Sequence, residues 1–158
     1  MESESPIKKE YKKLQKKHSL PTFEKLDENF HVSKIGEKDL SFLAREIRGS
    51  MNEKFSAYLA LFENLLSPAG PPMFVFSLLR GISPGDKEKV KEIYTILAKS
   101  QLDIMKLDTV YSEEKEIEFI NNSYEKWQDL KLEIMQLIEN FESIFGNENS
   151  ERTKGYLG

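Results

Sequence analysis

Cysteine is absent from the chain of 158 residues, and this absence excludes disulfide scaffolds, thiolate zinc sites and cysteine nucleophiles. Histidine is scarce, since His18 and His31 are the only two, and little remains for metal binding or for a catalytic triad. The phosphate-binding loops Gly-x-x-x-x-Gly-Lys-Ser/Thr and Gly-x-Gly-x-x-Gly do not occur. We therefore expect a protein that is not an enzyme and that holds neither a cofactor nor a metal ion.

Long hydrophobic runs are also absent. No uninterrupted apolar segment approaches the ~20 residues that a membrane span needs. The first 18 residues are rich in charge and lack the apolar core of a secretory signal. The composition, 39% hydrophobic and 32% charged, is that of a folded and highly soluble domain. These features predict a cytoplasmic location and no integral membrane association.

Glycine and proline are few, and many of them lie in two short segments, 68–72 and 81–85. Between such breaks, apolar residues recur at helical spacing, and we find neither an internal repeat nor a strong strand signal. The pattern predicts an all-α fold: an antiparallel bundle of three long helices at about 37–67, 84–110 and 112–146, with short helices near 6–18, 22–30 and 73–80. We expect three regions, namely a basic N-terminal helix at 1–20, a helical bundle domain at 21–146 and a mobile polar tail at 147–158.

Two features of the long helices leave alternatives open. Gly49 lies inside the first of them, where we expect either the close approach of another helix, which we favour, or a bend. The last helix, which we expect to end at Gly146, carries an apolar stripe from Ile117 to Phe145 with a mean spacing of about 3.5 residues, the period of bundles and coiled coils. At Ser112 the last two long helices are so close in sequence that one nearly continuous rod is the alternative, and a rod would favour a homodimer.

The formal net charge of -4 is unevenly spread along the chain. Residues 1–18 hold six lysines against three glutamates, whereas residues 112–146 hold nine acidic residues against three lysines. A basic helix can bind nucleic acid because its lysines displace counterions from phosphates, and it can also bind an anionic membrane surface, lie against the acidic last helix or simply be solvated. The candidate nucleic-acid-binding residues are Lys8, Lys9, Lys12, Lys13, Lys16 and Lys17.

The short segment 73–80 is apolar almost all round and lies between two breaks. If its first residues are buried, they cap one end of the bundle, and if they are exposed, they form a partner-binding patch. We favour burial, since monomers seldom expose such patches. The candidate partner-binding residues are Met73, Phe74, Val75 and Phe76.

Glu28 and His31 form the chain's one Glu-x-x-His pair. Carboxylate-bridged metal sites in helical bundles need this motif twice, and no glutamate lies three residues before His18. We interpret His31 as a solvated or capping residue near a helix end and assign no metal ligand.

The interpretation we favour is a non-enzymatic helical protein-interaction module, such as an adaptor, an assembly factor or a small subunit of a complex. Its protein partner would contact the residues at 73–76 or the acidic last helix. Binding of nucleic acid or a ribonucleoprotein through the lysine-rich N-terminal helix is the alternative. An enzyme with an active site inside the bundle ranks last.

Overall fold

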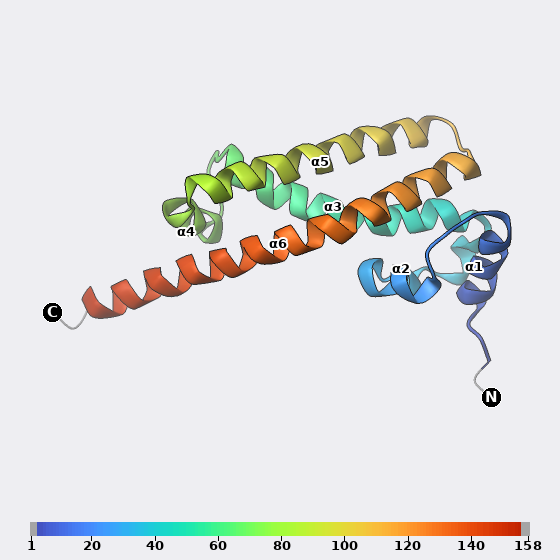
Figure 1. Ribbon diagram of the computed structural model, residues 1–158, viewed down its shortest axis with the longest axis horizontal. Helices are drawn as coiled ribbons and strands as arrows, with labels where there is room; N and C mark the ends of the chain where they lie inside the picture. The colour runs from blue at the N-terminus through green and yellow to red at the C-terminus, as the bar shows by residue number, and fades with distance from the viewer. Residues whose placement is uncertain (1–2, 156–158) are drawn as a thin grey trace. The chain divides into compact units, whose positions relative to one another are not determined.

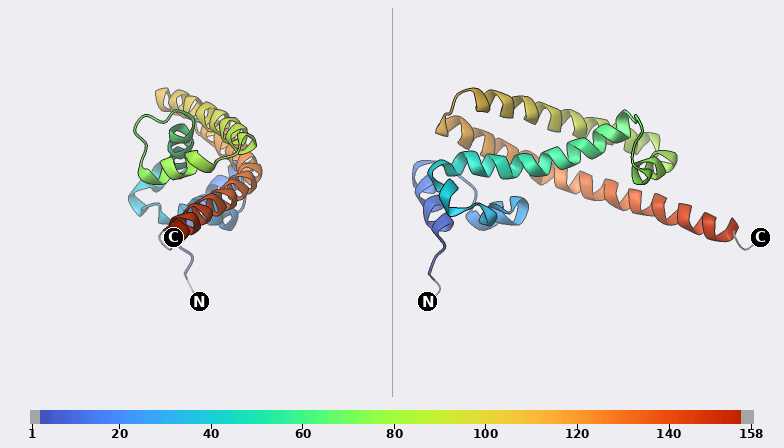
Figure 2. Two further views of the ribbon diagram at one scale, coloured as in Figure 1. Left: turned by 90° about the vertical axis from the view of Figure 1, so that its left-hand side faces the viewer. Right: turned by 180° about the vertical axis from the view of Figure 1, so that it is seen from behind.

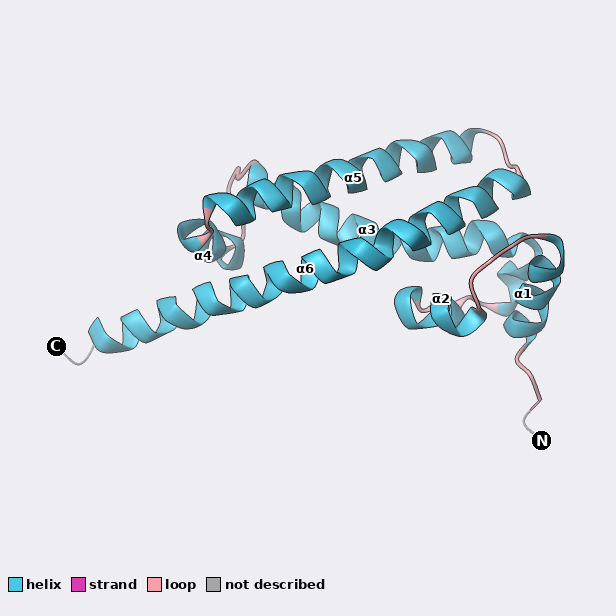
Figure 3. Ribbon diagram, viewed as in Figure 1, coloured by secondary structure: helices cyan, strands magenta, loops and turns pink. Residues whose placement is uncertain are grey.

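The computed structural model of the protein describes residues 3–155, with the side chains of residues 3–147. This part of the chain contains helices and loops but no strand (Figure 1, Figure 3). The predicted all-α fold is confirmed, whereas the antiparallel arrangement of three long helices stays a prediction. In chain order the elements are α1 (Pro6–Lys17), α2 (Phe23–Phe30), the 3₁₀ helices η1 (Val32–Lys34) and η2 (Glu37–Phe42), α3 (Leu43–Leu66), α4 (Met73–Gly81), α5 (Pro84–Thr109) and α6 (Glu113–Gly155).

Local signals explain where several helices begin. Pro6 is the first residue of α1, a position where an amide hydrogen would have no partner within the helix. Thr22 caps α2, because its hydroxyl oxygen accepts a hydrogen bond of 3.3 Å from the amide of Lys25. Ser112 caps α6 in the same way, through a contact of 3.4 Å with the amide of Lys115. Proline at the first helical position, and threonine or serine at the N-cap, are residue types that favour the start of a helix.

The C-terminal end of α6 differs from the prediction. The helix continues through Gly146 to Gly155 and does not end at Gly146. A glycine costs a helix about 1 kcal/mol relative to alanine but does not stop it, and no proline follows in the sequence. Of the tail predicted at 147–158, residues 147–155 are therefore helical, and residues 156–158 lie outside the described residues.

Gly49 does not mark a close contact between helices. No atom lies within 4 Å of the position that a Cβ would take there, so the expected close packing is wrong. Such an approach is found at Gly81, the last residue of α4, where a Cβ would overlap the side chain of Ile144 on α6. The absence of a side chain at Gly81 therefore lets α4 pack closely on α6.

The chain divides into two compact units. Unit 1 consists of Met1–Ser56 and Lys99–Trp127, and unit 2 of Ala57–Ala98 and Gln128–Gly158. The long helices α3, α5 and α6 each contribute one part to each unit.

Unit 1 contains the junction between α5 and α6. The chain reverses direction there, between the end of α5 at Thr109 and the start of α6 at Glu113 (Figure 1). Arg48 of α3 joins both helices: its Nε donates to Glu116 Oε2 at 2.6 Å, and its Nη2 donates to Asp108 Oδ1 at 2.9 Å. The alternative of one continuous rod is therefore wrong.

Unit 2 has an apolar core to which α3, α4, α5 and α6 all contribute. At its edge, the side-chain nitrogen Nδ2 of Asn140 on α6 donates to both carboxylate oxygens of Asp86 on α5, at 3.1 Å each. The short helix α4 lies where α3 ends and α5 begins (Figure 2). The buried apolar residues of unit 2 are Phe62, Leu65, Val75, Leu78, Val90, Ile93, Leu97, Leu130, Ile134, Leu137 and Phe141.

Candidate partner interface

Prolines and a glycine set the position of α4. Pro68 follows the end of α3 and disfavours helical backbone at the residue before it, so α3 cannot continue. Gly70 has a φ of +67°, in the left-handed region that favours glycine. Pro72 then occupies the N-cap of α4 with extended backbone, and the helix begins at Met73. The segment 67–72 thus turns the chain sharply and starts a new helix.

One side of α4 anchors it in unit 2. Its buried residues are Val75, Ser77 and Leu78. The close approach of Gly81 to Ile144 holds the C-terminal end of the helix against α6. Because these contacts fix α4 in place, the side chains on its other sides have defined positions.

Those other sides are exposed and apolar. Met73 is 80% exposed, Phe74 54% and Phe76 48%, so the predicted burial is wrong for these three residues. Val75, the fourth candidate partner-binding residue, is buried. The reason is geometric: α4 has only nine residues, and its neighbours bury one side of it, so a segment that is apolar all round must leave large side chains in solvent. We call Met73, Phe74 and Phe76 the α4 patch.

Two neighbours flank the α4 patch. The ring of Phe145 on α6 lies 6.2 Å from the ring of Phe74, centroid to centroid, and is itself partly exposed. The guanidinium of Arg80 lies 4.6 Å from the centroid of the Phe76 ring, in cation–π geometry. The exposed surface is therefore an aromatic cluster with a cation beside it.

The lysine-rich helix α1 packs against the rest of unit 1 with its apolar side. Ile7, Tyr11 and Leu14 are buried, and the Tyr11 hydroxyl donates to the backbone oxygen of Pro21 at 2.6 Å. Burial raises the pKa of Tyr11 well above its ordinary value, and the nearby charge of Glu24 adds to the effect. The six candidate lysines lie on the remaining, solvent-facing sides of α1.

Glutamates pair with half of these lysines. Lys8 lies 3.0 Å from Glu24, Lys13 lies 2.9 Å from Glu10, and Lys12 pairs with Glu4. Two hydrogen bonds lower the pKa of the Glu24 carboxyl group: the larger effect comes from the backbone of Glu24 itself, and the next from the side chain of Lys8. The other three are exposed and have no ion pair among residues 3–147: Lys9, Lys16 and Lys17. The structure thus leaves a smaller basic surface than the sequence predicts.

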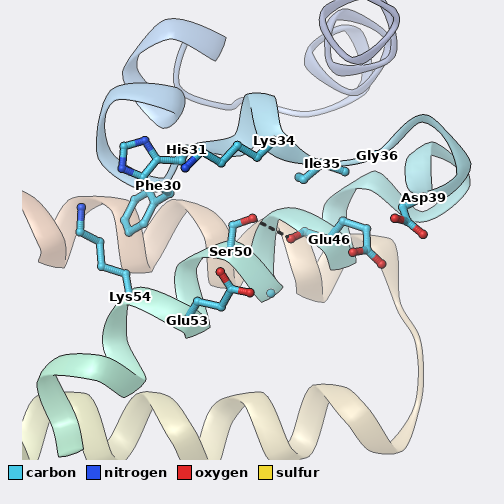
Figure 4. Close-up of a pocket in the computed structure, with 11 residues that line it drawn as sticks. Phe30, His31, Lys34, Ile35, Gly36, Asp39, Glu46, Ser50, Glu53 and Lys54 are labelled. Carbon is cyan, nitrogen blue, oxygen red and sulfur yellow. Dashed lines mark hydrogen bonds between the residues drawn. The ribbon is translucent and has the colours of Figure 1, made fainter.

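A pocket of about 580 Å³ lies in unit 1 between the end of α2, η1 and α3 (Figure 4). His31 is the C-cap of α2, is exposed, and has a φ of 54°, which agrees with its interpretation as a residue at a helix end. No group of three or more histidine, cysteine or acidic residues in the described part of the chain could hold a metal ion. This pocket could not be predicted from the sequence, because its walls come from separate segments: Phe30, His31, Lys34, Ile35, Gly36, Asp39, Glu46, Gly49, Ser50, Glu53 and Lys54.

The segment Gly81–Gly85 has the spacing Gly-x-Ser-x-Gly of a nucleophile elbow, but its surroundings differ from those of a hydrolase. An elbow follows a strand and precedes a helix, whereas this segment joins α4 to α5. The hydroxyl oxygen of Ser83 accepts a hydrogen bond of 3.1 Å from the amide of Asp86. Ser83 therefore acts as a helix cap.

Comparison of the chain with protein-family models, with curated proteins and with solved structures finds no match. Among the described residues, no helix combines the length and the apolar character that crossing a membrane requires.

Proposed function

We propose that the protein is a non-enzymatic helical protein-interaction module that contacts a protein partner through the α4 patch. The observation that carries this proposal is the exposure of three large apolar side chains, Met73, Phe74 and Phe76, on a helix whose other side is anchored in unit 2. Exposing apolar side chains to water is unfavourable, and an exposed apolar cluster of this kind is typical of surfaces that another protein covers. Aromatic residues and arginine are also the types that contribute most to binding at protein interfaces.

The test compares two matched double variants with the unchanged chain in affinity capture from the organism of origin. Phe74→Ser with Phe76→Ser removes the aromatic rings of the α4 patch. Leu102→Ser with Met105→Ser removes two apolar side chains of similar or greater exposure from α5, in unit 1, and serves as the control. Far-UV circular dichroism checks that every variant keeps its helices.

The proposal predicts a defined, stoichiometric partner that the unchanged chain and the Leu102/Met105 control retain and that the Phe74/Phe76 variant loses. Retention of the same partner by the Phe74/Phe76 variant would show that the interface lies elsewhere. The absence of any stoichiometric partner would contradict the interaction function itself.

A second candidate function is the binding of nucleic acid by α1, and the exposure of Lys9, Lys16 and Lys17 on one docked helix favours it. Such binding should weaken steeply with salt, because each phosphate contact releases counterions. In anisotropy titrations with RNA and duplex DNA, reversing these three lysines to glutamate should abolish binding at low salt. The control reverses three exposed lysines on α5 and should have little effect: Lys87, Lys91 and Lys99. No binding by the unchanged chain at low salt would exclude this function.

A further inference from the structure

A second pocket in unit 1 lies between α5 and α6, on the side of the turn that joins them. Its walls come from residues 100–110 of α5 and the following turn and from residues 115–126 of α6, all of which belong to unit 1. Its volume is about 400 Å³. This volume is within the range of sites that bind small organic molecules, and it exceeds what a single ion would fill. We call it the α5–α6 pocket.

Two buried serines line the α5–α6 pocket. Ser100 on α5 is 7% exposed and Ser123 on α6 is 5% exposed. Neither hydroxyl has a hydrogen-bond partner among the described residues, and each stays accessible to solvent. The two serines lie 11 and 12 residues from Tyr111, at the turn where the chain reverses direction. The reversal therefore brings both hydroxyls to the same level of the pocket.

Other hydroxyls on the helices of this chain bond to the backbone. Ser50, Thr95 and Ser143 each donate to the carbonyl oxygen four residues earlier, at 3.3, 2.9 and 3.2 Å. That oxygen lies within reach of any serine or threonine inside a helix. Ser100 and Ser123 depart from this arrangement, and a buried polar group without a partner is unfavourable. A ligand in the α5–α6 pocket would supply the missing partner to both.

The charged residues of the α5–α6 pocket leave an excess of one positive charge. Asp103 and Lys106 pair with each other at 3.9 Å. Lys126 is exposed, forms no ion pair with a described residue and lies one helical turn from Ser123. Glu118, the second acidic residue, is further from Ser123 along α6. The five charged residues that line the pocket are Asp103, Lys106, Lys115, Glu118 and Lys126.

Apolar side chains line the α5–α6 pocket nearer the turn. Leu107 on α5 and Phe119 on α6 are both buried and both border it. Each is closer in sequence to Tyr111 than the serine on the same helix is. The pocket thus has a polar end with two hydroxyls and an ammonium group, and an apolar region beside it.

We infer that the α5–α6 pocket binds a small organic carboxylate with an apolar body. The hydroxyls of Ser100 and Ser123 donate to the carboxylate oxygens, Lys126 supplies the opposite charge, and Leu107 and Phe119 contact the body of the ligand. A single negative charge matches the excess of one positive charge in the pocket. The site lies wholly in unit 1, whereas the α4 patch belongs to unit 2. The proposal therefore goes beyond the proposed function, and either can fail without the other.

Titration of the ¹⁵N-labelled full chain with three probes, followed by NMR, tests the site and its chemistry. Octanoate has both a carboxylate and an apolar body, acetate lacks the body, and octylammonium carries the opposite charge. We expect octanoate to shift the amide signals of residues 100–110 and 115–126 saturably, and acetate and octylammonium to bind at least tenfold more weakly. Equal binding of either comparison probe, or octanoate shifts confined to other residues, would overturn the proposal.

Three single substitutions remove the polar groups of the site one at a time. Ser100→Ala and Ser123→Ala each remove one hydroxyl, and Lys126→Gln removes the charge. We expect each to raise the Kd for octanoate about tenfold, because each removes one hydrogen bond or ion pair to a charged group.

Two matched controls should leave the Kd for octanoate unchanged. Ser143→Ala removes a hydroxyl that already donates to the backbone, in unit 2. Lys99→Gln removes an exposed lysine of α5, in unit 1, that does not line the pocket. An unchanged Kd in all three pocket variants, or equal effects of the controls, would overturn the proposal.

Thermal melts without any probe distinguish ligand-binding hydroxyls from structural ones. Ser100→Ala and Ser123→Ala lose no hydrogen bond within the chain, and alanine is the better helix former, so the melting temperature should not fall. A marked fall would show that the hydroxyls stabilise the fold, and it would overturn their assignment. Phe74→Ser with Phe76→Ser should leave octanoate binding intact. Loss of binding in that variant would place octanoate on the α4 patch and overturn the proposal.

Discussion

Replacing Arg48 with methionine should destabilise unit 1 by about 3–5 kcal/mol, because the change leaves a buried carboxylate without its partner. Glu116 is fully buried, and the Nε of Arg48 donates to its Oε2 at 2.6 Å. The other carboxylate oxygen, Oε1, has no hydrogen-bond partner among the described residues. Once the guanidinium is gone, the negative charge of Glu116 has neither water nor a cation to stabilise it.

The size of the effect distinguishes Glu116 from Asp108, the second acidic partner of Arg48. The side chain of Asp108 is 60% exposed, so Asp108→Asn should cost no more than about 1 kcal/mol. Burial alone would lower the pKa of Arg48, but hydrogen bonds and charge from Glu116, and then from Asp108, outweigh it and raise that pKa. Arg48 therefore stays charged, and its loss removes a full positive charge from the core of unit 1.

Removing both members of the buried pair should cost less than removing one. Arg48→Met combined with Glu116→Leu leaves no buried charge, so the double variant should be more stable than Arg48→Met alone, and the two effects should not add.

Urea unfolding, followed by the fluorescence of Trp127, measures these differences in unit 1. Trp127 is the only tryptophan, is buried, and lies in the same unit as Arg48. A cost below about 1 kcal/mol for Arg48→Met, or a double variant as unstable as the sum of the single ones, would refute the reasoning.

Three further changes test other parts of the structure. Tyr11→Phe should cost about 0.5–1.5 kcal/mol in urea unfolding near neutral pH, since the hydroxyl donates to the backbone oxygen of Pro21. Burial raises the pKa of Tyr11 in the folded chain, so above about pH 10 the unfolded chain ionises first and stability falls. Thermal melts at about pH 8 and about pH 11 should therefore show a smaller loss for Tyr11→Phe than for the unchanged chain, and an equal loss would contradict the assignment. Gly81→Ala should destabilise unit 2 by about 1–3 kcal/mol, since a Cβ would overlap Ile144, and adding Ile144→Ala should recover most of the loss; a higher melting temperature for Gly81→Ala alone would show that α4 is not packed closely there.

The helices could be predicted from the sequence because their signals are local. Apolar spacing, a proline at the start of α1 and capping residues at Thr22 and Ser112 depend only on neighbouring residues, and the structure contains the corresponding helices. The end of α6 could not be predicted in the same way, because Gly146 weakens a helix without preventing it from continuing.

Burial could not be predicted equally well, because it depends on which elements approach a helix. The segment 73–80 is apolar almost all round, which predicts burial, yet its neighbours cover only the side with Val75 and Leu78. Glycine shows the same difficulty: Gly49, inside a long helix, has no atom near its missing Cβ, whereas Gly81, in a segment read as a break, has the close contact. On α6, the core stripe explains Ile134 and Leu137 but not the exposed apolar side chains beside it.

Site-specific photocrosslinking in cells of the organism of origin tests the central claim most directly. A photoreactive phenylalanine analogue replaces Phe76 in the α4 patch, and a matched control carries it at Thr95, an exposed position on α5 in the same unit. The account predicts an adduct of defined mass with another protein from position 76 and none from position 95. No adduct at position 76, or the same adducts from both positions, would contradict the claim that α4 presents a partner-binding surface.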